Sequence, residues 1–122
     1  MLMCDTEFDD KAFFERGVRL VKFCKPSDSE AEVIGCEMRR RAKKLNANFS
    51  QECAMMLLEM PELIPKSWRK RKIVFSGTMW KDENYDRVPY LVWRGEKHGW
   101  QLDFGYSAGM WDGSFRLLAF RS

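Results

Sequence analysis

Histidine is almost absent from this chain, because His98 is the only one among 122 residues. Imidazole is the side chain that titrates near neutral pH without strong perturbation, so the chain has few groups suited to ordinary acid–base catalysis. His98 lies in a GEKHG loop with no neighbour to orient it, and no serine or cysteine lies in a nucleophile motif. Glycine-rich phosphate-binding motifs are also missing. We therefore expect a protein that is not an enzyme and has no catalytic residues.

Closely spaced metal ligands are missing as well. Cys4, Cys24, Cys36 and Cys53 lie far apart in the first half of the chain. A structural zinc site needs close cysteine or histidine pairs, so we expect neither a metal nor another cofactor. The second half, which is rich in turns and would gain most from disulfides, has no cysteine. Reduced and mostly buried thiols are the expectation.

Long apolar runs do not occur either. A membrane-spanning helix needs about 20 consecutive apolar residues, and no stretch approaches this length. The first residues, MLMCDTEFDD, are acidic where a secretory signal would be basic and then apolar. We expect a cytoplasmic protein, in the host cytoplasm if a phage encodes it, with no membrane partner and with an oligomeric state that the sequence leaves open.

Aromatic residues and glycine divide the chain into two parts. Five of the aromatic residues, all Phe, precede position 66, whereas twelve follow from Trp68 onward, including every Trp and Tyr. Six of the eight glycines follow position 76. This distribution predicts a single domain over 1–122, with a helical half (1–65) and an antiparallel sheet half (66–122).

Amphipathic helices are predicted in the first half, where apolar residues recur at three- and four-residue spacing. The first helix spans about 6–25, the second about 27–45, and a third about 48–60, before Pro61. Capping residues are expected at the start of the first two helices (Thr6, Ser27 and Ser29).

Strands are predicted from Lys72 onward, because the apolar period changes to two. The clearest is 100–106, which pairs with 90–94 across the GEKHG turn, and further strands are expected at 73–80 and 115–121. Pro89 should lie on an edge strand or at the start of a strand. The predicted fold class is α+β, with two to three N-terminal helices packed on a C-terminal four-stranded antiparallel β-meander.

Positive charge gathers in the middle of the chain. The formal net charge is +3, but it divides into −3 over residues 1–34, +6 over 35–75 and zero over 76–122. Two clusters produce the excess: Arg39, Arg40, Arg41, Lys43 and Lys44 in the second predicted helix, and Lys66, Arg69, Lys70 and Arg71 around Trp68.

These two clusters are candidate binding residues. If the fold joins them, they form a positive surface with Trp68 among the cations, which suits DNA, RNA or an acidic protein. Two simpler interpretations remain open. The first cluster can be a solvated helix face, favoured near a helix C-terminus, and Trp68 can be a residue packed between the helices and the sheet.

Exposed aromatic residues are the second candidate feature, because the sheet half holds too many large rings to bury under three short helices. Trp111, between Gly109 and Gly113, is the best candidate for an exposed anchor, and Tyr85 and Tyr106 are others.

Three functions fit these features. We favour a small non-catalytic intracellular binding protein, of the kind that phages and mobile elements use as inhibitors, including anti-CRISPR proteins. It would block a protein or nucleoprotein partner through the basic patch and the exposed aromatic residues. One alternative is a regulator that binds nucleic acid directly. The other is a ribonuclease toxin of the RelE type, by analogy of architecture, with Arg94, Lys97, His98 and Tyr106 on one hairpin.

Overall fold

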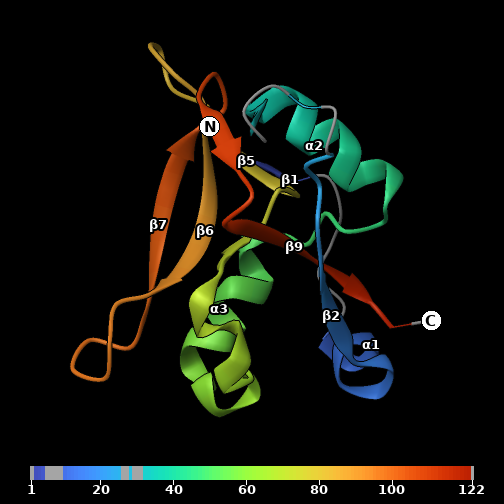
Figure 1. Cartoon of the computed structure of the whole chain (residues 1–122), viewed down its shortest axis with the longest axis vertical. Helices are drawn as coiled ribbons and strands as arrows, with labels where there is room; N and C mark the ends of the chain where they lie inside the picture. The colour runs from blue at the N-terminus through green and yellow to red at the C-terminus, as the bar shows by residue number, and fades with distance from the viewer. Residues whose placement is uncertain (1, 5–9, 26–27, 29–31, 122) are drawn as a thin grey trace.

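A mixed β-sheet forms the centre of the molecule (Figure 1). The computed structural model describes residues 2–4, 10–25, 28 and 32–121. The strand order is β1–β5–β6–β4–β9–β2, with β7 paired to β6 as well. These strands are β1 (Leu2–Cys4), β2 (Val18–Val21), β4 (Lys72–Val74), β5 (Thr78–Trp80), β6 (Arg87–Trp93), β7 (Trp100–Tyr106) and β9 (Phe115–Phe120).

A second, two-stranded sheet and short helices complete the described part of the chain. The small sheet pairs β3 (Glu32–Ile34) with β8 (Met110–Asp112). The helices are α1 (Asp10–Arg16), α2 (Gly35–Lys44) and α3 (Gln51–Glu59), with 3-10 helices η2 (Pro61–Leu63) and η3 (Lys66–Lys70). No helix in the described ranges has both the length and the apolar character that crossing a membrane requires.

The predicted fold class is wrong, because no four-stranded C-terminal meander forms. The last strand, β9, does not follow β7 in the sheet: it pairs in parallel with β4 and antiparallel with β2. The predicted strand 73–80 is divided into β4 and β5 by the turn at 75–77. The first half of the chain supplies strands to both sheets, so the helices do not form a separate N-terminal layer.

The first predicted helix fails in its second half. α1 ends at Arg16, and Gly17 then takes a left-handed conformation with φ 71°, which only glycine adopts without strain. Residues 18–21 form β2 along β9. Because β2 has apolar side chains on both of its faces, with Leu20 on one core and Val21 on the other, its sequence resembles a helical run.

The second predicted helix begins later than expected. Residues 32–34 form β3, and α2 starts at Gly35. The predicted caps at Thr6, Ser27 and Ser29 lie outside the described residues. The third predicted helix is confirmed as α3, which starts after Ser50 and ends before Pro61. The predicted hairpin is confirmed as β6 and β7, whose register includes Leu91 opposite Leu102.

Pro89 lies inside β6, at neither an edge nor a start. Its carbonyl accepts a hydrogen bond of 3.0 Å from the Phe75 amide, so its ring nitrogen faces the same neighbour. At that point the neighbouring chain is the turn between Val74 and Thr78, where β4 has ended and β5 has not begun. Pro89 has no amide hydrogen to donate, and at this position no neighbouring strand in the described chain requires a hydrogen bond from it.

The sheet has an apolar core on each face. Ile73 belongs to one core with Leu57 of α3, whereas the next residue, Val74, belongs to the other core with Met38 of α2. Consecutive residues of a strand point to opposite faces, so α3 and α2 cover different faces of the sheet. Figure 1 shows the two helices well apart.

Candidate functional site

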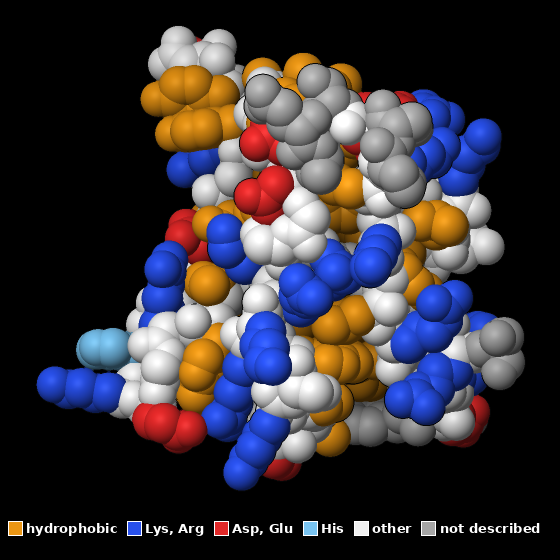
Figure 2. All heavy atoms as spheres, in the orientation of Figure 1, with side chains coloured by type: hydrophobic (Ala, Val, Ile, Leu, Met, Phe, Trp, Pro, Cys, Tyr) orange, Lys and Arg blue, Asp and Glu red, His pale blue; other side chains and the backbone are white. Residues whose placement is uncertain are grey.

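The two basic clusters do not join. The first is on α2, which packs on the core that contains Val74, whereas Trp68 of the second cluster packs against the core that contains Ile73. The predicted continuous patch is therefore divided between opposite faces of the sheet. Figure 2 shows Lys and Arg side chains distributed over the visible face, with apolar side chains between them.

The arginines of α2 make structural contacts. Arg39 Nε donates to the Ser76 carbonyl at 3.1 Å, which ties the helix to the turn between β4 and β5. Arg40 Nη2 donates to Glu37 Oε2 at 2.8 Å, one turn back along the helix. Because their guanidinium groups are already engaged, Arg39 and Arg40 are less available to a partner than the sequence suggests. Lys43 and Lys44 are exposed.

Arg41 makes several contacts at once. Its Nη1 and Nη2 donate to the two carboxylate oxygens of Asp28 at 2.8 and 2.9 Å, and Nη1 also donates to the Phe23 carbonyl at 2.9 Å. The hydrogen bonds from Arg41 hold the pKa of Asp28 at about 2. Hydrogen bonds from Arg40, and then from Arg41, hold the pKa of Glu37 at about 2. Arg41 thus fastens Phe23 and Asp28 to α2.

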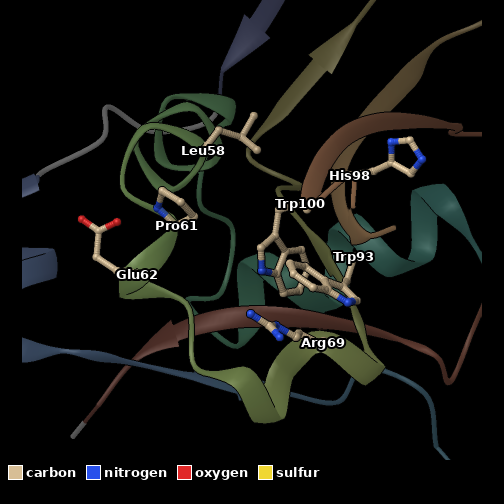
Figure 3. A pocket seen from close by; sticks show the side chains of 8 residues that line it. Leu58, Pro61, Glu62, Arg69, Trp93, His98 and Trp100 are labelled. Atoms are coloured by element: carbon tan, nitrogen blue, oxygen red, sulfur yellow. The ribbon is translucent and has the colours of Figure 1, made fainter. Parts of the chain in front are cut away.

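The second cluster borders a cavity of about 500 Å³ between η2, η3 and the β6–β7 hairpin (Figure 3). Arg69 Cζ lies 3.8 Å from the centre of the Trp93 ring, and Trp93 meets Trp100 edge-on at 5.8 Å. Arg69 Nη1 also pairs with Glu96 Oε1 at 3.0 Å. The remaining lining residues are Leu58, Pro61, Glu62, His98 and Gly99.

This cavity combines a flat cation with two indole rings. Arg69 Nε is buried and makes no hydrogen bond within the described part of the chain. Lys66, Lys70 and Arg71 are exposed nearby in sequence, whereas Trp68 is half-buried and packs against the core. Trp68 therefore packs against the core, as in the simpler of its two interpretations. Trp93 and Trp100 were not predicted as lining residues, because their position beside Arg69 depends on how η3 packs against the hairpin.

The hairpin residues of the ribonuclease alternative do not converge. His98 is exposed in the loop at one end of β7, and Tyr106 is the last residue at the other end. A seven-residue strand rises roughly 20 Å, so these two side chains cannot share one substrate atom. Arg94 pairs with Asp103 at 3.1 Å.

Trp111 is buried, which corrects the prediction that it is an exposed anchor. Its exposed fraction is 2%, its indole Nε1 donates to the Tyr106 carbonyl at 3.1 Å, and its ring meets Phe115 at 4.7 Å. The ring lies over Gly105, where a Cβ would be 2.6 Å from its edge. Gly105, a glycine inside the strand, is the sequence signal that could have indicated this packing, because glycine in a strand often marks a close approach by another group.

Exposed apolar side chains gather at another place, which we call the apolar face: Ile34, Tyr85, Tyr106 and Met110. Ile34 and Met110 are opposite one another in the β3–β8 sheet, and the rings of Tyr85 and Tyr106 are 5.0 Å apart. Their exposed fractions run from 41% to 56%, so the predicted exposure of both tyrosines is confirmed.

A hollow of about 440 Å³ connects the two halves of the apolar face. Ile34 and Tyr85 both line it, together with exposed Cys36 and the acidic loop that includes Asp82, Glu83 and Asp86. In Figure 2 hydrophobic side chains are visible along the upper edge of the molecule. This is an apolar surface with an acidic rim, and its members come from four separate segments of the sequence.

Free thiols and acidic side chains do not assemble into a reactive centre in the described residues. Cys24, Cys36 and Cys53 are free, and burial raises the pKa of the Cys53 thiol well above its ordinary value. Across residues 10–25, 28 and 32–121, no group of three or more His, Cys, Asp or Glu side chains is placed to hold a metal ion.

Comparison with protein families, with curated proteins and with solved structures finds no match to this chain, so its function is inferred from the residues described above.

Proposed function

We propose that this chain is a non-catalytic binding protein that covers the surface of a protein partner with its apolar face, in the manner of a small inhibitor. The observation that carries this proposal is the grouping of Ile34, Tyr85, Tyr106 and Met110. Eight large apolar residues are exposed in the described part of the chain, and four of them are connected through one hollow. Ile34 and Tyr85 line the hollow, Met110 is paired with Ile34, and Tyr106 is in ring contact with Tyr85. Single exposed apolar residues are ordinary, whereas a contiguous group marks an interaction site.

The chemistry of the apolar face suits a protein partner. Tyrosine supplies a large contact area at low cost in conformational entropy, and methionine adapts its shape to an uneven surface. The acidic loop with Asp82, Glu83 and Asp86 favours a partner whose contact surface is basic. The basic cluster on α2 has a smaller role than first expected, because its arginines already have contacts within the protein.

Affinity capture with matched variants tests this proposal. Met110→Lys places a charge on the apolar face, whereas Met55→Lys places the same charge at an exposed methionine of α3, with exposed fractions of 56% and 45%. We expect the wild-type protein and Met55→Lys to capture the same partner from the native cells, and Met110→Lys to capture at least about tenfold less. Equal capture by all three proteins, or capture of no specific protein, contradicts the proposal.

A second function is favoured by the cavity at Arg69. An arginine stacked on a tryptophan, with exposed Lys66, Lys70 and Lys97 in the adjoining segments, is the kind of surface on which an unpaired base stacks while cations contact phosphates. We infer that single-stranded RNA or DNA is the alternative ligand of the protein, at a place separate from the apolar face.

Binding to short single strands decides this alternative. We expect micromolar affinity for oligonucleotides at low salt, with a steep decrease as salt is raised. Arg69→Ala should weaken binding by about tenfold or more, whereas Lys81→Ala, on a distant loop, should not. Failure to bind at about 50 mM salt would remove direct nucleic-acid binding from consideration.

A further inference from the structure

Arg116 is a buried cation whose position nothing above explains. It lies in β9 with an exposed fraction of only 9%. Its Nη1 donates to the backbone carbonyls of Gly113 and Phe115, the latter at 2.9 Å. Within the described residues these two contacts go to neutral carbonyls, and no ion pair joins Arg116 to a carboxylate. A largely buried guanidinium is stabilised by a nearby negative charge, and an anion in the adjoining pocket would supply one.

Arg116 lines a pocket of about 340 Å³ beside the end of β2. Lys22 and Lys25 line the same pocket, and their side chains are exposed. The other lining residues are Phe23, Cys24, Gly113 and Phe115. The pocket is therefore lined by three cationic residues and by no acidic one within the described chain. Burial, and then the positive charge of nearby Arg71, lowers the pKa of Arg116.

Acidic groups near the pocket are already engaged. Asp28 binds Arg41 through both of its oxygens. Asp112 accepts hydrogen bonds from the amide and hydroxyl of Ser114, the former at 2.8 Å. The Cys24 thiol donates weakly to the Trp111 carbonyl at 3.7 Å, and its pKa is raised, chiefly by burial and then by Asp28, so it stays neutral. The described surroundings thus leave an excess of positive charge at the pocket.

We propose that this pocket binds a phosphate group, with Arg116 as its buried anchor and Lys22 and Lys25 as its outer contacts. Nε and Nη2 of a guanidinium form a fork that matches two oxygens of a phosphate, and lysines add charge from the rim. The pocket has the volume of a small-molecule site. The phosphate can come from inorganic phosphate, from a mononucleotide or from a nucleic-acid backbone. These sources share the same contacts at Arg116.

Titration followed by backbone NMR tests the proposal, with three probes: inorganic phosphate, a mononucleotide with a 5′-phosphate, and a short oligonucleotide with only internal phosphodiesters. We expect saturable shifts at residues 22–25 and 113–116 with at least one probe. The probe that binds most tightly identifies the source. Because this pocket is separate from the apolar face and from Arg69, its test is independent of the proposed function and its alternative.

Three variants make the result decisive. Arg116→Gln should abolish the saturable shifts, and the double variant Lys22→Ala/Lys25→Ala, which keeps the buried anchor and changes only exposed side chains, should weaken binding by about tenfold. Lys81→Ala changes an exposed lysine in the loop after β5, outside this pocket and outside the Arg69 cavity, and should leave the affinity unchanged. The proposal is overturned if no probe gives saturable shifts at low salt. It is equally overturned if the folded double variant binds as tightly as the wild-type protein.

Discussion

Arg41 illustrates how one residue of a basic cluster can be structural. Its guanidinium joins Asp28, Glu37 and the Phe23 carbonyl, so it connects a loop, its own helix and the end of β2. The sequence shows a run of like charges at this point, and the acidic partner at Asp28 lies 13 residues away. Charge counts along a sequence cannot identify such a partner, because the pairing depends on the tertiary contact that brings Asp28 to α2.

The pairing of Asp28 predicts a loss of stability in acid. Its pKa is about 2 in the folded protein against an ordinary value of 3.8, so its contribution is fully present above about pH 4 and is lost as the pH falls toward 2. Asp28→Asn should make stability depend less on pH in this window, as measured by urea unfolding at several pH values. Glu83→Gln, at an exposed loop position, is the control and should keep the wild-type dependence. An unchanged dependence in Asp28→Asn contradicts this role.

Gly77 is a second residue with a specific structural role, because its position leaves no space for a side chain. A Cβ at this position would press on the backbone carbonyls of Asn48 and Phe49, and the Gly77 amide donates to Phe49 at 2.9 Å. Gly77→Ala should lower the free energy of unfolding by about 1–3 kcal/mol, because backbone atoms cannot move aside cheaply. Gly113 has open space around its Cβ position, so Gly113→Ala should change stability by less than about 0.5 kcal/mol. Equal losses of stability for Gly77→Ala and Gly113→Ala in thermal or urea unfolding would contradict this steric explanation.

At the scale of elements, α3 is held against the sheet by its buried side chains. Leu57 is 1% exposed and packs in the core that contains Ile73, Leu91 and Leu118. Leu57→Ala should cost about 2–5 kcal/mol, since it leaves a cavity in a closed core. Met55→Ala, on the exposed side of the same helix, should cost far less. Urea unfolding of the two variants separates the contribution of core packing from that of helix propensity. Similar losses in the free energy of unfolding for both variants would show that α3 is not anchored by its buried side.

The sequence predicts those elements whose pattern is local. α3 has a regular apolar side and ends before Pro61, and the β6–β7 hairpin alternates cleanly across a short turn. β2 and β3 were missed because they are short and their partners, β9 and β8, lie far away in the chain. The parallel pairing of β4 with β9 likewise has no pattern in the local sequence that would predict it. These pairings depend on tertiary contacts that no single segment of the sequence contains.

At the scale of the whole molecule, the candidate surfaces were predicted only in part. The exposure of Tyr85 and Tyr106 was expected correctly, whereas Trp111 fills the core behind Gly105. The apolar face needs Ile34 beside Met110, a contact made by strand pairing across more than seventy residues. Arg116 is an isolated charge in an apolar strand, FRLLAF, and its burial follows only from the way β9 enters the sheet.

The most direct test of the central claim is hydrogen–deuterium exchange on the protein alone and in complex with the captured partner. Binding through the apolar face predicts slower exchange at residues 82–86 and 106–110 in the complex, with little change at η3 and the 94–99 loop. Slowing confined to η3 and that loop, or to α2, would contradict the claim that the apolar face is where this protein acts.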